Sequence, residues 1–207
     1  MTNLKLFCFS GMLIPIIYIF MYLLGGALRK DYSHISNSVS ELLSPGAPNK
    51  RMLVPIQVVY AALHIIFGFG VLWFINGWES IYSIGQIGAW LIIALGLTTF
   101  GTVIFPQDDP GQPETRAGRL HKILVFGGLV PFSILSTLFI GLWARKAGFS
   151  PGFDIYSFIT VGATVVMGIA GGLSVETRFA GLVERIAAIV TQQWLFILGL
   201  ILLLHYQ

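Results

Sequence analysis

Six apolar runs, each about 20 residues long, make up most of this sequence and are separated by short polar intervals. A run of that length forms a helix that crosses roughly 30 Å of hydrocarbon. Only 10% of the 207 residues are charged, whereas about a quarter are charged in an ordinary soluble domain. We therefore predict an all-α, polytopic membrane protein with a single domain over residues 1–207. The expected spans are 6–28, 52–75, 83–105, 123–144, 155–173 and 185–206.

Three longer polar intervals, 29–51, 105–122 and 174–185, carry most of the remaining polar residues. An even number of crossings separates each interval from the next, so all three are expected on one face and both termini on the other. Nine of the twelve Lys and Arg residues lie on the face of the three loops. The positive-inside rule then places these loops in the cytoplasm and both termini outside the cell membrane.

The net charge of +3 raises the question of nucleic-acid binding. No basic run or basic-aromatic strip is present, and the Lys and Arg residues stand at helix ends, where they anchor helices to anionic headgroups. We therefore expect membrane lipids, and no nucleic acid, as partners. Gly168 and Gly172 form a G-x-x-x-G spacing, which is typical of tight packing within one chain and also of homodimers, and both alternatives stay open.

Two polar side chains fall within the second apolar run. His64 lies near its middle, where a polar group is costly and therefore marks a functional candidate. Gln57 stands seven residues earlier on the same helix face, so we expect the two to form a polar seam toward the loops. The alternative for His64 is a neutral imidazole that bonds a carbonyl or a Thr of a neighbouring helix.

The loops contain the side chains that are able to perform acid–base or metal chemistry. We select His34, Asp108 and His121 as candidate catalytic residues. Histidine and carboxylate groups are also common metal ligands, but none of those in the loops has a ligand spacing such as His-x-x-x-His, so a metal site stays open. The residues expected to bind a ligand are Ser38, Glu41, Gln57, His64, Asp109, Arg119, Glu176 and Arg178.

A serine nucleophile in the first loop is a further alternative. One of Ser36, Ser38 and Ser40 would act with His34 or His121 as its base, although no Gly-x-Ser-x-Gly elbow is present. The spacing of Ser38 and Glu41 also fits a capping box, which predicts a short helix that starts near Ser38. The structural alternative for Asp108 and Asp109 is turn formation ahead of Pro-Gly.

Charges in the three loops are expected to hold them together as a cap. The acidic and basic residues concerned are Glu41, Asp108, Asp109 and Glu176, and Arg51, Arg116, Arg119 and Arg178. Glu184 and Arg185 are expected at the membrane interface with their charges in water. Asp154 is expected to cap the fifth span, and His205 to have no polar neighbour except Gln207.

The segments YSHISNSVSELLSPGAPNK and FPQDDPGQPETRAGRLHK carry a family resemblance. The first resembles the Ser-Glu-Leu and Gly-Ala-Pro signature of the prokaryotic membrane family of domain of unknown function 998. The second is similar to that family's Phe-Pro-x-Asp after the third helix and its His at the start of the fourth. The resemblance implies six helices over nearly the whole chain, but no activity.

That family is distantly similar to eukaryotic membrane proteins that include GPI-anchor-remodelling and autophagy-modulator members. Those proteins are usually drawn with the first loop on the non-cytoplasmic side, which is opposite to the orientation that the Lys and Arg distribution indicates.

The sequence leaves two classes of function open. It does not identify a cofactor. The first is a lipid-handling or lipid-modifying protein with a polar site under the three loops. The second is a non-enzymatic binder or carrier of a small hydrophobic molecule, or a modulator of a membrane partner. Side chains of His34, Asp108 and His121 within about 5 Å of one another would favour an enzyme, and their dispersal would favour the second class.

Overall fold

Each apolar run forms a helix in the computed structural model, which describes residues 2–78, 83–175 and 177–205. All six helices are long and apolar enough to cross a membrane, and the described residues contain no strand. The prediction of an all-α, multi-pass membrane protein is therefore confirmed. The elements are α1 (Thr2–Ala27), η1 (Ser40–Leu43), α2 (Lys50–Trp78), α3 (Ile84–Ile104), α4 (Arg116–Leu124), η2 (Val125–Leu129), α5 (Val130–Ala147), α6 (Phe153–Ser174) and α7 (Ala180–His205).

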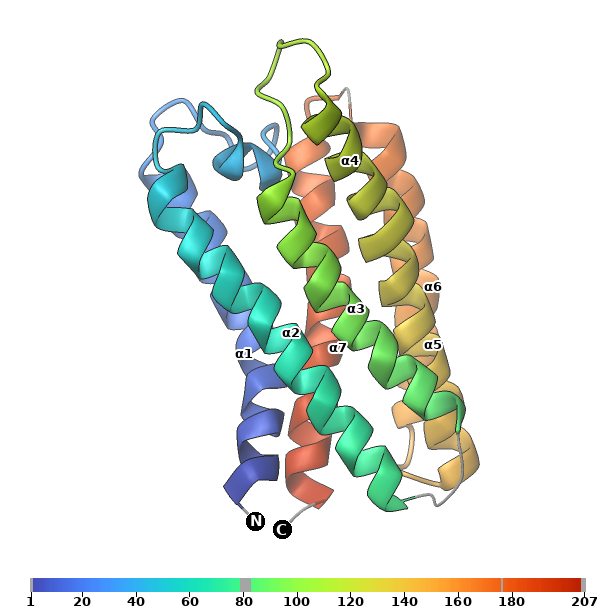
Figure 1. Ribbon diagram of the computed structural model, residues 1–207. Coiled ribbons are helices and arrows are strands. Elements are labelled where there is room, and N and C mark those ends of the chain that lie inside the picture. The colour runs from blue at the N-terminus through green and yellow to red at the C-terminus, as the bar shows by residue number, and fades with distance from the viewer. Residues whose placement is uncertain (1, 79–82, 176, 206–207) are drawn as a thin grey trace.

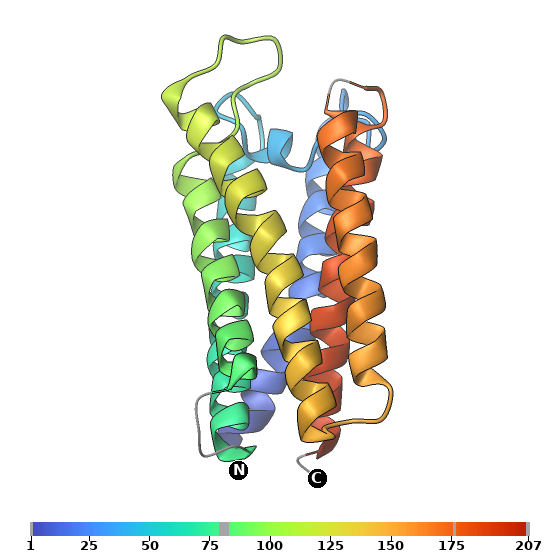
Figure 2. The same ribbon diagram turned by 90° about the vertical axis from the view of Figure 1, so that its right-hand side faces the viewer.

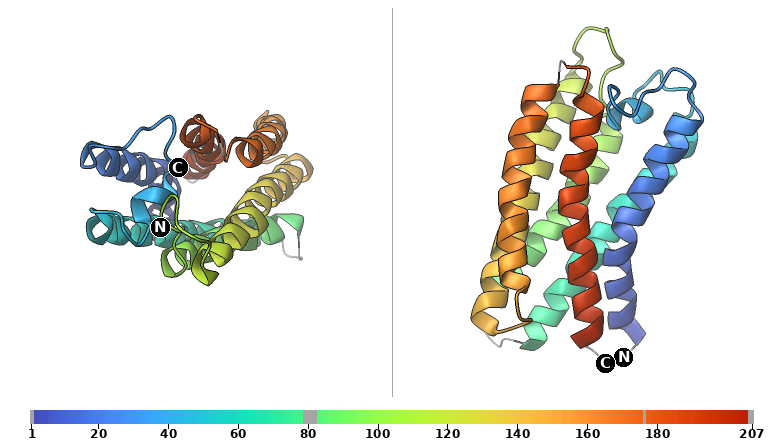
Figure 3. Two further views of the ribbon diagram at one scale, coloured as in Figure 1. Left: turned by 90° about the horizontal axis from the view of Figure 1, so that it is seen from above. Right: turned by 180° about the vertical axis from the view of Figure 1, so that it is seen from behind.

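The helices pack in a ring, and α4, η2 and α5 together form one of its spans, Arg116–Ala147. Both termini lie at one end of the bundle, here called the terminal end, and the three polar loops lie at the other, the loop end (Figure 1). Seen from above, α1, α2, α3, α5, α6 and α7 follow one another until α7 packs against α1 (Figure 3). The predicted placement of the three loops on one face is therefore correct.

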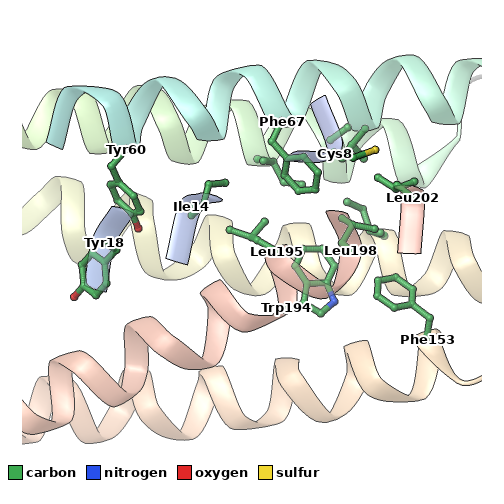
Figure 4. Packing of buried hydrophobic residues seen from close by; sticks show 14 of the residues in the cluster. Cys8, Ile14, Tyr18, Tyr60, Phe67, Phe153, Trp194, Leu195, Leu198 and Leu202 are labelled. Carbon is green, nitrogen blue, oxygen red and sulfur yellow. The ribbon is translucent and has the colours of Figure 1, made fainter. Parts of the chain in front are cut away.

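Large apolar side chains fill the interior of the ring. Phe67 of α2 and Trp194 and Leu198 of α7 are at most 1% exposed and lie close together in Figure 4. Small residues allow the helices to approach closely. A Cβ at Gly85 would lie 2.6 Å from Cγ of Trp143, so only glycine lets α3 come this near to α5.

Two helices begin well before the predicted spans. α4 begins at Arg116 rather than 123, and α7 begins at Ala180 rather than 185. The Thr115 side chain caps α4 by accepting a hydrogen bond from the Gly118 amide at 3.1 Å. Hydropathy locates the part of a helix that lies in lipid, whereas caps decide where its hydrogen bonds begin. The prediction that Asp154 caps the fifth span is wrong, because the cap position of α6 is occupied by Gly152.

A π-helical turn, η2, interrupts the fourth span just before Pro131. Proline has no N–H, and its ring collides with the carbonyl four residues earlier, so the preceding turn widens by one residue. In Figure 2 the span made by α4, η2 and α5 runs obliquely, near α6 at the terminal end and away from it at the loop end.

Candidate functional site

The first loop folds over the loop end of the bundle and contains the short 3₁₀ helix η1. The Ser38 amide donates to Oε1 of Glu41 at 3.0 Å, and the Glu41 amide donates to Oγ of Ser38 at 3.2 Å. These reciprocal bonds are the predicted capping box, and η1 begins two residues after Ser38. Asn37 donates to Oε2 of Glu41 at 2.8 Å. Glu41 is thus occupied with holding the loop in shape.

Ser40 of η1 and His121 of α4 meet across the cap. Nδ1 of His121 lies 3.0 Å from the carbonyl oxygen of Phe105, and Nε2 lies 3.3 Å from Oγ of Ser40. Because a carbonyl only accepts, the neutral imidazole carries its proton on Nδ1 and leaves the lone pair of Nε2 facing the hydroxyl. The side chain of His121 is buried, with 7% of its surface exposed. This is the relation of a nucleophile to its base.

Asp108 caps the N-terminus of α4 from the preceding loop. Its carboxylate accepts from the Thr115 amide at 3.0 Å and from the Thr115 hydroxyl at 2.6 Å. These bonds lower the pKa of Asp108, so it is ionised at neutral pH, which suits a helix N-terminus. A Cβ at Gly118 would lie 1.8 Å from Oδ2 of Asp108, so the arrangement needs glycine there. These contacts of Asp108 fit the structural role that the sequence offers as the alternative to a catalytic one.

Hydrogen bonds from neutral donors join the first loop to the second. Asp109 accepts from the Ser44 hydroxyl at 2.6 Å and from the Gly46 amide at 3.0 Å. The Ser38 hydroxyl donates to Oε1 of Gln107 at 3.4 Å. The two loops therefore pack on one another, as predicted. Among the described residues no opposite-charge pair joins two of the loops, so that part of the prediction is wrong for them, whereas pairs of Glu176 lie outside the described residues.

Hydrogen bonds join the first turns of α7 to the first loop. Oε2 of Glu184 accepts from the Val39 amide at 2.8 Å, next to Ser40. Nη1 of Arg185 donates to the carbonyl oxygens of His34 at 2.9 Å and Asn37 at 3.0 Å. Arg185 is only 5% exposed, so the prediction that its charge lies in water is wrong. The loop that covers α7 supplies the acceptors that water was expected to provide.

The groups in direct contact with the buried guanidinium of Arg185 are neutral. Its guanidinium lies 5.2 Å from the ring centre of Tyr22 and 5.5 Å from that of Tyr32, and Nη2 donates to the Tyr32 hydroxyl. No carboxylate of the described residues lies within 4 Å of it. Burial raises the pKa of Tyr32 to about 12, so that hydroxyl stays neutral.

His34 belongs to this arginine cluster rather than to the Ser40–His121 pair. Its ring packs edge-on against Tyr22 and Tyr32, with ring centres 5.8 and 5.3 Å apart. Burial, and then the Arg185 charge, lower the pKa of His34. No hydrogen bond or salt bridge of the described residues joins His34 to Asp108 or His121. Within the same residues, no three His, Cys, Asp or Glu side chains are grouped to hold a metal ion.

The two polar residues of the second span differ in their contacts. Nδ1 of His64 lies 2.9 Å from the Tyr60 carbonyl oxygen of its own helix, and its ring packs edge-on against Tyr60. Gln57 is 8% exposed, and Oε1 of Gln57 has no hydrogen-bond partner among the described residues. The Tyr60 hydroxyl accepts from Gln192 at 3.0 Å and so links α2 to α7.

The remaining predicted residues lie away from the Ser40–His121 pair. Arg119 pairs with Glu114 at 3.1 Å and its side chain is 69% exposed. Arg178 stacks over the ring of Phe179 at 4.8 Å. Glu176 lies outside the described residues. His205 was expected to lack polar contacts, but its Nε2 lies 2.8 Å from the Phe149 carbonyl oxygen, so it ties the end of α7 to the loop before α6.

Two spaces in the described residues lie away from the pair. A space beneath the first loop, lined in part by Gly25, Leu42 and Leu53, has no room for a water molecule. A cavity of about 460 Å³ lies at the terminal end of α2, where Trp73, Phe74 and Trp78 contribute to its wall. At the pair itself, His121 is buried and Ser40 is partly exposed.

Comparison with known proteins agrees with the resemblance seen in the sequence. A family model described as "Protein of unknown function (DUF998)" matches residues 12–201. The match reaches from α1 to α7 and includes all three loops. Searches of curated proteins and of solved structures gave no match.

Proposed function

The chain belongs to the DUF998 family of proteins of unknown function, which assigns it no activity, and we propose from its own residues that it is a lipid-modifying membrane enzyme. The proposed reaction cleaves or transfers an acyl group of a lipid ester. The observation that carries this proposal is the contact between Oγ of Ser40 and Nε2 of His121, with Nδ1 held by the Phe105 carbonyl.

In the proposed reaction Ser40 is the nucleophile and His121 is the base. As Oγ of Ser40 forms a bond to the ester carbonyl carbon, its proton passes to Nε2 of His121. When the bond to the leaving alcohol breaks, His121 returns that proton to the alcohol oxygen. Water then repeats the sequence on the acyl-serine: its proton passes to His121, the fatty acid leaves, and the proton returns to Ser40. The Phe105 carbonyl holds the ring in this orientation.

Three further contacts would keep the nucleophile in place. Glu184 holds the amide next to Ser40, Glu41 completes the capping box of η1, and Asp109 ties the segment after η1 to the second loop. These residues act on the position of Ser40 and do not reach the reacting atoms.

The depth of the pair supports a lipid as substrate. His121 lies five residues inside the span Arg116–Ala147, at its loop end. The headgroup and ester region of a bilayer borders the hydrocarbon at such a helix end. An ester at this border would meet the pair without leaving the membrane.

Labelling with a fluorophosphonate tests the proposal. Purified protein in nanodiscs should react at Ser40, and Ser40→Ala and His121→Gln should abolish both labelling and ester hydrolysis. Loss of the base alone should lower the rate by about 10²-fold or more. Ser36→Ala changes an exposed serine of the same loop and should leave both readouts intact. Full hydrolysis by Ser40→Ala would refute the assignment.

The dispersal of His34 from the Ser40–His121 pair favours the second class, a non-enzymatic lipid binder. The same experiment separates the two functions. Lipid that copurifies at a fixed ratio, together with no labelling of the wild-type protein, would support the binder.

A further inference from the structure

One face of α6 is fully buried near the terminal end and less closely covered near the loop end. Thr160 and Thr164 lie on its bundle-facing side and are 3% and 6% exposed. Gly171 stands seven residues beyond Thr164 and therefore lies on the same side, two turns nearer the loops. A Cβ at Gly171 would meet no atom of the described residues within 4 Å. The neighbour that covers Thr164 is missing at Gly171.

The neighbour is lost because the fourth span leans away. At Gly168 a Cβ would still lie 3.3 Å from Cγ1 of Val130, which is the first residue of α5. Beyond Val130 the π-turn begins, and α4 diverges from α6 toward the loop end (Figure 2). Phe126 and Ile123 are 50% and 58% exposed in that part of the span. The view from above shows the loop ends of α4 and α6 apart (Figure 3).

This opening lies between membrane spans and reaches the height of His121. It lies between two membrane spans, Arg116–Ala147 and Phe153–Ser174, so hydrocarbon rather than water borders it. Its side chains are apolar, as Ile123 and Phe126 illustrate. His121 stands two residues from Ile123, on the loop side of the opening. A chain that lies along the opening therefore has its polar end at the height of His121.

We propose that the opening between α6 and the α4–η2 segment receives the acyl chain of a long-chain lipid ester directly from the bilayer. The inference rests on the function proposed above and adds its substrate class, a membrane-resident ester rather than a water-soluble one. Ser40 is partly exposed, so a small soluble ester reaches it from the loop end, whereas the oblique fourth span offers a long acyl chain a route from lipid.

Filling the opening with a large side chain tests the route. Gly171→Phe places a ring where no described atom lies within 4 Å. Hydrolysis of a long-chain phosphatidylglycerol in nanodiscs should fall at least about tenfold. Hydrolysis of p-nitrophenyl butyrate, and labelling of Ser40, should stay within about twofold of wild type. Unchanged turnover of the long-chain lipid would overturn the inference.

The same helix offers a matched control. A Cβ at Gly162 would likewise meet no described atom within 4 Å, and Gly162 lies nine residues from Gly171, which puts it on the opposite side of α6. Gly162→Phe should leave both substrates unaffected. An equal effect of the two variants on the long-chain lipid would refute a specific route.

A readout without turnover separates this inference from the proposed function. In the Ser40→Ala protein, a phosphatidylglycerol with a diazirine in its acyl chain should cross-link to peptides that contain Phe126 or Gly171 in preference to the face of Gly162. That pattern supports the opening even if no ester is cleaved by the wild-type protein. Uniform cross-linking around α6 overturns the opening whatever the activity is.

Discussion

Arg185 is a charged side chain held almost entirely by main-chain oxygens. It donates to the carbonyls of His34, Asn37 and Gly181, while the rings of Tyr22 and Tyr32 cover its faces. Burying an ion is costly, and here dipoles and aromatic faces offset that cost without a carboxylate of the described residues within 4 Å. The residue thereby connects the first loop to the last helix.

Replacing Arg185 should therefore destabilise the protein. Arg185→Leu leaves three carbonyl oxygens without their donor, and buried unsatisfied groups cost about 1–3 kcal/mol each, so we expect a loss of about 3 kcal/mol or more. Thermal unfolding in detergent measures it. Arg178→Leu removes an exposed cation from the neighbouring loop and should stay within about 0.5 kcal/mol of wild type. Similar losses in both variants would contradict the role of Arg185.

The protonation of His34 should make this cluster sensitive to acid. Its pKa is lowered by burial and by Arg185, whereas the unfolded chain has an ordinary histidine pKa of about 6.5. The unfolded state then binds more protons, so the contribution of His34 is full above about pH 6.5 and is lost as the pH falls through the folded pKa. When the pH is lowered from about 8 to about 5, the His34→Phe variant should lose less thermal stability than the wild-type protein loses. Identical pH profiles would exclude His34 as the source.

Among the elements, α4 shows how a loop decides where a membrane helix starts. Its first turn is capped by Thr115, which is itself held by Asp108, and Gly118 gives that carboxylate its room. The capped segment carries His121 toward η1. The position of the base thus depends on a contact in the loop before it.

Gly118→Ala should disturb that contact. A Cβ 1.8 Å from Oδ2 of Asp108 forces the carboxylate off Thr115, and we expect a loss of about 1–3 kcal/mol. Gly127→Ala, in the same span, meets only Ile123 at 3.9 Å and should be neutral or slightly stabilising. In the double variant Asp108→Ala, Gly118→Ala, the cost should be smaller than the sum of the single costs. Additive costs would show that the two residues act independently.

The elements also show which features were predictable from the sequence. The six spans follow from apolar length, and the Ser38–Glu41 capping box follows from a spacing of three residues. The contact of Ser40 with His121 joins residues 81 apart, and that of Arg185 with Asn37 joins residues 148 apart. Local patterns carry no information on such pairs, because they depend on how the loops lie over the packed helices. Sequence analysis therefore offers Ser40 with His121 as one of several serine–histidine pairings but has no means to choose among them.

For the whole molecule, the orientation in the membrane stays a prediction. Nine of twelve Lys and Arg residues lie on the face of the loops, which favours a cytoplasmic loop end, whereas the distant eukaryotic proteins are drawn the other way. The contacts of Arg185 weaken the argument from the Lys and Arg count. Arg185 is bound within the cap, so it adds a positive charge to the loop face for a structural reason and not as a signal of orientation.

Cysteine labelling decides the orientation. In a Cys8→Ser background, Gln112→Cys at the exposed loop end should react with a membrane-impermeant maleimide only after the cells are opened. Lys146→Cys, exposed at the terminal end of α5, is the matched position and should react in intact cells. The reverse pattern would place the three loops outside.

The hydrogen bonds between α7 and the first loop have a consequence for biosynthesis. A ribosome releases the loop that contains Ser40 early, and the helix that carries Glu184 and Arg185 last. Four spans are made and inserted between them. During that time Glu184 and Arg185 have not been synthesised, so the amide of Val39 and the carbonyls of His34 and Asn37 lack these hydrogen-bond partners. The cap therefore closes only once α7 has been made, and a chain that stops before α7 lacks the contacts that hold the first loop in place.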